Sequence, residues 1–314
     1  MAADDRAIVA LVGPTAAGKT DAAMLLADRY PVSLISLDSA MVYRGMDIGT
    51  AKPTPEQLAH YPHALIDIRD PHEIYSVAEF IEDADAAVRA ALEAGRVPLL
   101  VGGSMMYLKA FREGIAPMPA ADSAVRAALT AEAEERGTQV LHQRLQRLDP
   151  EAAARIHPNN FPRIQRALEV HALTGKTISA HWKSARGVRE RHRAALLEFG
   201  IEPDSRAQLH RRIERRLDAM LAAGFVEEVA GLKRRVRMNR ELPSMRAVGY
   251  RQVWDYLDGL TDEAGMRENV LAATRQLARR QLTWMRSWPQ LLVLSWGTGA
   301  RLVDEIVDRS GLNR

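Results

Sequence analysis

The sequence predicts an α/β protein with a doubly wound, mainly parallel sheet and an inserted all-helical domain. Two observations predict this fold class. In the first 116 residues, short apolar segments alternate with helical patterns, which is typical of a parallel sheet with crossover helices. Residues 122–192 then contain helical patterns without a convincing strand, before a strand pattern returns at 195–201. We therefore expect an α/β core formed by 1–116 and 195–314, interrupted by a helical domain at 117–194.

The first strand, helix and connecting loop carry the clearest motif. The apolar run 7–12 predicts a buried strand, and 21–29 has helical spacing. Between them lies GPTAAGKT at 13–20, the phosphate-binding loop (P-loop) pattern in its required strand–loop–helix context. A chance match on an ordinary strand-to-helix turn is the alternative, and the flanking pattern disfavours it.

This loop predicts the binding of a di- or triphosphate group. Its backbone N–H groups can form a nest for an anion, and the following helix adds about half a positive charge at its N-terminus. Lys19 supplies a mobile full charge, and the Thr20 hydroxyl can ligate Mg²⁺. The predicted phosphate contacts are Gly13, Pro14, Thr15, Ala16, Ala17, Gly18, Lys19 and Thr20.

Three more strands are expected in the first part of the chain. They span 32–37, 64–68 and 97–101, with an irregular loop at 43–55 and helices at 76–94 and from 105 onward. The first of these strands ends at Asp38 and the last is followed by Ser104. Ligands of parallel sheets lie outside the carboxyl ends of the strands, so we expect the P-loop, Asp38 and Ser104 to face one crevice.

The second part of the chain is helical and basic. Helices are expected at 123–136, 161–173, 205–235 and 262–286, with a last strand at 290–295. Residues 1–120 contain 10 Lys and Arg against 16 Asp and Glu, whereas the remainder contains 33 against 24. This asymmetry indicates either a polyanionic partner or a solvated, arginine-rich helical surface, and charge alone does not separate the two.

Composition excludes several classes of function. The 314 residues include no cysteine, which rules out disulfides, cysteine-type zinc sites and thiol nucleophiles. The N-terminus is acidic, and no apolar run approaches the roughly 18 residues that a membrane span needs. We expect a soluble cytoplasmic protein without a membrane partner, acting as a monomer.

Longer motifs give the sequence a family resemblance. They are DSAMVYRGMDIGTAKP (38–53), VGGSMMYLKA (101–110), HPNNFPRIQRALEV (157–170), LPSMRAVGYRQVW (242–254) and TRQLARRQLTWMR (274–286), together with the P-loop. In these residues the chain resembles the bacterial tRNA dimethylallyltransferases. That family transfers a dimethylallyl group from its diphosphate to the exocyclic amine of the adenine 3′-adjacent to the anticodon.

The resemblance implies roles for the crevice residues. The P-loop would bind the diphosphate of the donor with Mg²⁺, and Lys19 would stabilise the leaving group. Asp38 would act as the general base for the adenine amine, with a Mg²⁺ or water ligand as its alternative role. Ser104 stands where the family usually has Thr, and its hydroxyl would donate to the bridging or leaving oxygen.

The resemblance also implies a set of contacts to the tRNA anticodon stem-loop. About half of the arginines among them could instead be solvated side chains. Trp284 and Trp288, four residues apart, are expected in the core rather than as stacking platforms for bases. The implied contacts are Asp38, Ser39, Ala40, Met41, Ser104, Arg126, Pro162, Arg163, Ile164, Gln165, Arg166, Ser244, Met245, Arg246, Ala247, Val248, Gly249, Arg275, Gln276, Arg279, Arg280 and Thr283.

Three other functions are compatible with a P-loop core. The same core could support an ATP-dependent small-molecule kinase, an isopentenyltransferase acting on a free adenine nucleotide, or a non-catalytic RNA-binding regulator. A small acceptor needs no inserted helical domain or basic surface, which disfavours the first two. The expected convergence of Asp38 and Ser104 on the P-loop disfavours the third.

Overall fold

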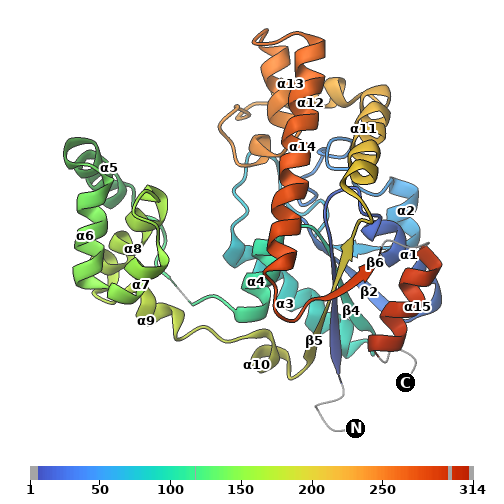
Figure 1. The fold of residues 1–314 in the computed structure, drawn as a ribbon, viewed down its shortest axis with the longest axis horizontal. Coiled ribbons are helices and arrows are strands. Elements are labelled where there is room, and N and C mark those ends of the chain that lie inside the picture. Colours follow the sequence, from blue (N-terminus) through green and yellow to red (C-terminus); the bar gives the residue numbers. More distant parts are fainter. Residues whose placement is uncertain (1–5, 117, 296–298, 311–314) are drawn as a thin grey trace. The chain divides into compact units, whose positions relative to one another are not determined.

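The computed structural model describes residues 6–116, 118–295 and 299–310 (Figure 1). The chain divides into two compact units, the first comprising 1–112 and 188–314 and the second 113–187. The described parts contain no helix that is both long and apolar enough to cross a membrane.

The first unit is built on a parallel sheet, which confirms the predicted fold class. Within the described residues six strands pair in the order β3-β2-β4-β1-β5-β6, and every pair is parallel. Val12 aligns with Gly102 and Gly200, and Leu37 also aligns with Gly102, so four strands end at the same edge. The strands are β1 Ala7–Val12, β2 Val32–Leu37, β3 His63–Ala64, β4 Val97–Gly102, β5 Ala195–Glu202 and β6 Leu292–Ser295.

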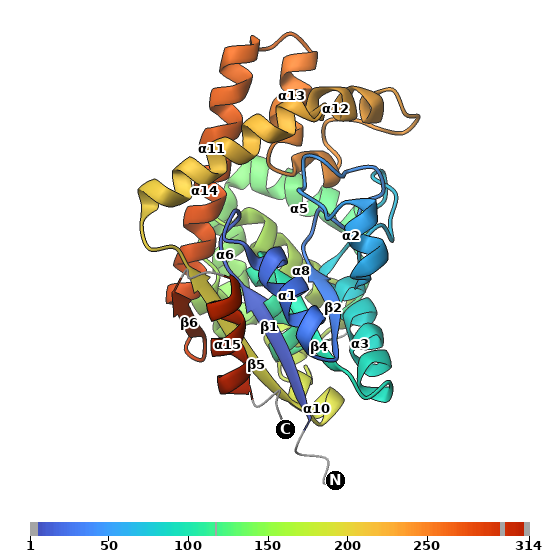
Figure 2. The ribbon, with the colours of Figure 1, turned by 90° about the vertical axis from the view of Figure 1, so that its right-hand side faces the viewer.

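Helices cover both faces of this sheet because its central strands are apolar on both sides. Val9 and Leu11 pack into a cluster with α1 (Lys19–Arg29) and α15 (Gly299–Ser310), which lie side by side in Figure 2. Ile8 and Ala10 join a second cluster on the opposite face. That cluster includes side chains of α3 (Val77–Glu93) and α4 (Met105–Glu113).

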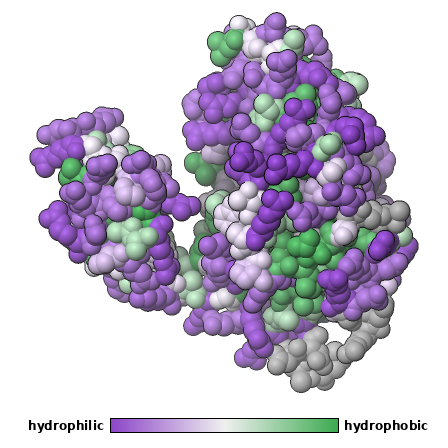
Figure 3. Space-filling model, viewed as in Figure 1, coloured by the Kyte–Doolittle hydropathy of each residue, from purple (hydrophilic) through white to green (hydrophobic). Residues whose placement is uncertain are grey.

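The remaining α-helices of the first unit are α2 Pro55–His60, α10 Val188–His192, α11 Arg206–Ala222, α12 Phe225–Lys233, α13 Tyr250–Leu257 and α14 Glu263–Arg286. Of these, α2 lies between β2 and β3, α10 comes just before β5, and the other four lie between β5 and β6. The expected helix at 205–235 is divided where Gly224 adopts a positive φ of 94°. Figure 3 shows mostly hydrophilic residues over the part of the surface that α12, α13 and the start of α14 form.

The predicted strand at 64–68 is wrong beyond residue 64. Leu65 and Asp67 have positive φ angles of 67° and 56°, which no strand residue adopts. The backbone N–H groups of Ile68 and Arg69 instead donate to the carbonyl oxygen of Val42, each at 3.0 Å. The apolar pattern of this segment therefore reflects its packing onto the 41–44 loop rather than a place in the sheet.

The second unit is all-helical. Its core contains Leu141, Leu145, Ile164 and Leu168, all buried. Its helices are α5 Ser123–Arg136, α6 Thr138–Leu148, α7 Pro150–Arg155, α8 Phe161–Thr174 and α9 Ile178–Trp182.

The limits of this unit, 113 and 187, lie earlier than the predicted 117 and 194. Its end lies earlier because α10 is anchored in the first unit. Two side chains of α10 hold the buried Asp85 of α3: His192 Nε2 lies 2.6 Å from Asp85 Oδ1, and Arg191 Nε donates to Oδ2 at 2.8 Å.

Candidate active site and nucleic-acid surface

The loop between β1 and α1 has the conformation that an anion nest needs. Gly18 occupies the left-handed region with φ 75° and caps α1, while Ala16 has φ 62°. A positive φ is strained for alanine, and such strain is held only where the surrounding structure fixes it. The loop therefore presents its backbone N–H groups beside the N-terminus of α1.

Lys19 lies folded over this loop. Its Nζ donates to the carbonyl oxygens of Gly13 at 3.0 Å and Pro14 at 2.8 Å. Burial and the nearby Arg216 guanidinium lower the pKa of Lys19 from 10.5 to about 7, although Asp38 acts in the opposite direction. An anion bound in the nest would be a counter-ion for the Lys19 ammonium group and would favour its charged form.

Asp38 follows β2 and is held by the backbone. Its Oδ1 accepts hydrogen bonds from the N–H of Ala40 at 2.8 Å and of Met41 at 3.3 Å. The Ser104 Oγ accepts from the N–H of Ser39 at 3.2 Å. The structure thus brings Asp38 and Ser104 to one edge of the sheet, as the order of strands and loops predicts.

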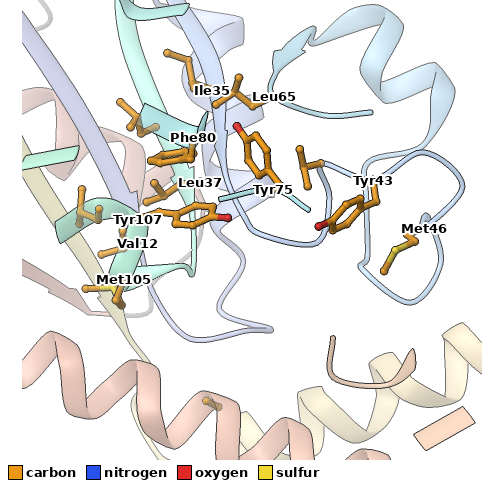
Figure 4. Close-up of a cluster of buried hydrophobic side chains, with 14 of the residues drawn as sticks. Val12, Ile35, Leu37, Tyr43, Met46, Leu65, Tyr75, Phe80, Met105 and Tyr107 are labelled. Atoms are coloured by element: carbon orange, nitrogen blue, oxygen red, sulfur yellow. The ribbon is translucent and has the colours of Figure 1, made fainter. Parts of the chain in front are cut away.

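Close packing of two strand ends fixes this arrangement. A Cβ on Gly102 would lie 2.0 Å from the carbonyl oxygen of Leu37, so only glycine fits there. The N–H of Ser104 donates to the same carbonyl at 3.2 Å. Beyond Ser104, Met105 and Tyr107 anchor α4, and the Tyr107 ring stacks on Phe80 with 4.2 Å between centroids (Figure 4).

A cavity of about 660 Å³ joins many of the predicted site residues of the first unit, although the predicted phosphate contacts Gly13 and Pro14 do not line it. Its size is in the range of small-molecule and cofactor sites. Among its lining residues are Thr15, Ala16, Ala17, Gly18, Lys19, Thr20, Asp38, Ser39, Ala40, Met41, Ser104, Arg246, Ala247, Val248, Gly249 and Arg280.

A second, shallower groove of about 350 Å³ lies along α14 and is lined by Gln276, Arg279, Arg280, Thr283 and Trp284. Arg280 and Trp284 line the cavity as well, so these two side chains border both hollows. The expectation that Trp284 belongs to the core is wrong: it is 37% exposed. Trp288 is buried as expected, under the Arg112 guanidinium at 4.4 Å.

Other predicted residues of the first unit have internal contacts. Ser244 and Met245 are buried, and the Ser244 hydroxyl donates to the carbonyl oxygen of Pro71 at 2.5 Å. Arg275 is partly buried and lines neither hollow.

The 38–53 motif is pinned to α12 by one carboxylate. Glu228 accepts from the backbone N–H groups of Asp47, Ile48 and Gly49 at 2.9, 2.7 and 3.1 Å. It also accepts from the Tyr250 hydroxyl at 2.6 Å. Glu228 thereby fixes the second of the two stretches of this motif that line the cavity, which are 38–41 and 49–51 together with Pro53.

Two residues at the site are absent from the predicted set: Arg216 lies outside the sequence motifs, and Gln281 lies within the motif at 274–286 without a predicted role. Arg216 of α11 donates from Nη1 to the Thr15 hydroxyl at 3.2 Å and lies in the same cavity. Gln281 of α14 accepts from the N–H of Thr15 at 2.9 Å and donates to the carbonyl oxygen of Gly103 at 3.0 Å. One side chain of the basic helix thereby joins the P-loop to the loop that carries Ser104.

In the second unit, two of the predicted arginines share one buried carboxylate. Glu169 has no exposed surface and accepts from Arg126 Nε at 2.9 Å and Arg166 Nη1 at 2.6 Å. Burial raises the pKa of Glu169, but these hydrogen bonds outweigh it and leave that pKa below its usual range.

The other predicted residues of this unit differ in exposure. Pro162 and Arg163 are exposed, whereas Ile164 is buried in the core. The Gln165 amide donates to the carbonyl oxygen of Arg126 at 3.0 Å.

Comparison with known proteins places this geometry in a family. The family model described as IPP transferase matches residues 41–288. tRNA dimethylallyltransferase 2 of Hahella chejuensis is 54% identical over 299 residues, covering 91% of this chain and 90% of that protein. A tRNA dimethylallyltransferase of Alkalilimnicola ehrlichii is 53% identical over 304 residues, covering 97% and 94%.

A solved structure agrees with these matches. The crystal structure of a tRNA isopentenylpyrophosphate transferase from Bacillus halodurans superposes with a TM-score of 0.71 at 37% identity, covering 98% of this chain and 96% of that one. The match to the family model begins at Met41 and extends past the end of α14, so it includes Ser104 and the 246–249 segment of the cavity lining but not the P-loop or Asp38. The chain belongs to the IPP transferase family.

Proposed function

We propose that the protein transfers a dimethylallyl group from dimethylallyl diphosphate to the exocyclic amine of the adenine 3′-adjacent to the anticodon in tRNA. The observation that carries this proposal is the single cavity in which Asp38 and Ser104 face the P-loop. Relatives that are more than half identical carry the name tRNA dimethylallyltransferase, which supports the same reaction.

The P-loop would hold the diphosphate as a leaving group. As the bond between the allylic carbon and oxygen breaks, negative charge grows on the diphosphate. Donors already fixed in position stabilise that charge more in the transition state than in the ground state. Lys19, Arg216 and Ser104 line the cavity: the first two, with the loop N–H groups, would fill this role, and Ser104 would donate to the bridging oxygen.

Asp38 would serve as the general base. The adenine amine attacks the allylic carbon, diphosphate leaves, and the proton released by the nitrogen passes to Asp38. Because Oδ1 is held by the N–H groups of Ala40 and Met41, the carboxylate has a fixed orientation at the cavity wall. A carboxylate within hydrogen-bond reach orients this weakly basic amine and takes its proton as the new bond forms.

Mg²⁺ fits the donors of this cavity as a partner of the diphosphate. The described residues contain no cluster of three or more His, Cys, Asp or Glu that could cage a metal. Magnesium in phosphate sites is commonly held by one or two protein oxygens, substrate phosphates and water. The Thr20 hydroxyl lines the cavity and would be the protein ligand, and the ion would neutralise charge on the leaving diphosphate.

The groove along α14 is the proposed path for the anticodon loop. Arg279 and Arg280 are exposed there beside the half-exposed Trp284 ring. Single-stranded RNA is bound by cationic side chains together with aromatic faces on which bases stack. The target base must leave its stack to react, and the cavity bordered by the same Arg280 and Trp284 would receive it.

Mass spectrometry of the tRNA tests this function. The protein is incubated with Mg²⁺, unmodified tRNA and dimethylallyl diphosphate, in parallel with free adenine nucleotides and with ATP plus small hydroxyl acceptors. We expect a dimethylallyl adduct on one adenine of the anticodon loop. Modification of the free nucleotide alone would contradict this function in favour of an isopentenyltransferase that acts on nucleotides. Phosphorylation of a small acceptor would contradict it in favour of a kinase.

A further inference from the structure

One polar side chain of β2 is buried without a partner. Ser36 is 3% exposed, and its Oγ has no hydrogen-bond partner among the described residues. The other serine of the strand, Ser33, accepts a hydrogen bond from Arg96 Nε at 3.1 Å. Leaving a buried hydroxyl unsatisfied costs stability, so a group of this kind points to a water, an ion or a ligand.

The strand geometry directs Ser36 toward the phosphate site. Side chains of a strand alternate between faces, and Leu34 packs in the cluster that contains α1, whereas Ile35 and Leu37 pack in the opposite one. Ser36 therefore shares the face of α1, which begins at Lys19. Ser36 and Thr20 line the same cavity.

We propose that the Ser36 hydroxyl accepts a hydrogen bond from a water molecule bound to Mg²⁺ in the complex with diphosphate. This inference rests on the proposed function. Magnesium keeps several waters when it is held by one protein hydroxyl and by phosphate oxygens, and each bound water needs an acceptor. A small hydroxyl set deeper than Asp38, in the strand rather than in the loop, suits a contact to the hydration shell.

The test compares Ser36→Ala with a matched control, Ser33→Ala, in the full-length protein. Calorimetry gives the affinity for inorganic diphosphate with Mg²⁺ and with a chelator, and thermal unfolding is followed without ligand. For Ser36→Ala we expect affinity with Mg²⁺ to fall about tenfold, as for loss of a hydrogen bond to a charged group. Affinity with chelator and melting temperature without ligand should not fall, because no internal hydrogen bond is lost.

The outcomes separate the alternatives. If Ser36→Ala weakens diphosphate binding equally with and without Mg²⁺, the proposal of a metal-bound water is overturned, and Ser36 contacts diphosphate directly. If diphosphate affinity is unchanged and the melting temperature falls, the proposal is also overturned, and Ser36 binds a structural water instead. If Ser33→Ala weakens binding as much, the effect is not specific to Ser36, which also overturns the proposal. Failure of the wild-type protein to bind Mg²⁺ and diphosphate would refute the proposed function itself, whereas failure of Ser36→Ala to differ refutes only this inference.

Discussion

Binding of the diphosphate should draw a proton onto Lys19. In the free protein, burial and Arg216 lower the pKa of Lys19 to about 7, so at pH 8 about nine-tenths of this side chain is neutral. A diphosphate anion beside it favours the charged form. Binding at pH 8 should therefore take up about 0.9 proton at Lys19, and only about 0.1 at pH 6, where the group is already charged.

Isothermal titration measures this uptake. A non-reactive thiolodiphosphate analogue is titrated with Mg²⁺ in buffers of different ionisation enthalpy, and the dependence of the observed enthalpy on the buffer gives the proton number. Protonation changes of the ligand itself cancel in comparison with Lys19→Arg, which remains charged across this range. Affinity of the wild type should fall about fivefold between pH 7 and 8 and close to tenfold per pH unit above pH 8. Equal proton numbers for both proteins at pH 8 would refute the lowered pKa.

Three other predictions follow from contacts in the two units. Gln281→Leu removes both bonds to the P-loop region, including that from the Thr15 N–H, and should raise the KM for dimethylallyl diphosphate about tenfold in steady-state assays. Replacing Arg279 and Arg280 by Gln should reduce the slope of log tRNA affinity against log salt by about 1.4 to 1.8. Glu169→Gln leaves two arginines without their counter-charge and should destabilise the second unit by about 3 kcal/mol, measured by hydrogen exchange across 113–187.

Each of these variants has a control or a contradicting result. An unchanged KM together with a lower melting temperature for Gln281→Leu would show that the Gln281 contacts serve only the stability of the fold. Arg301→Gln with Arg309→Gln removes the same charge from α15, outside both hollows, and should leave the salt slope unchanged. Glu169 stabilises the fold in its charged, hydrogen-bonded form, and this contribution is lost as pH falls through its depressed pKa. The cost of Glu169→Gln should therefore shrink in acid. A cost independent of pH would contradict that ion-pair account.

The sequence predicted those parts of the site that depend on strand order. A P-loop between β1 and α1 and side chains just after β2 and β4 must meet at one edge of a parallel sheet. The register of Val12 and Leu37 with Gly102 produces this meeting. Asp38 and Ser104 could therefore be placed together without any knowledge of side-chain packing.

Residues that reach the site from distant helices could not be predicted. Arg216 and Gln281 contact Thr15 across 201 and 266 positions. Gln281 lies within the motif at 274–286, but no local spacing marks either residue as a contact of the P-loop. The strand at 64–68 failed because apolar alternation does not reveal positive φ angles at Leu65 and Asp67. By contrast, the start of α2 does carry a signal in the sequence, because Thr54 and Gln57 form a capping box there.

The central claim is that one cavity holds the leaving diphosphate and the base that completes the transfer. The most direct test is the single-turnover rate of Asp38→Asn with saturating tRNA and dimethylallyl diphosphate, followed by rapid quench. Asparagine keeps an oxygen for the N–H groups of Ala40 and Met41 but cannot take the proton. We predict a rate about 10²- to 10⁴-fold lower with tRNA affinity nearly unchanged. A rate close to that of the wild type would contradict the assignment of Asp38 as the base.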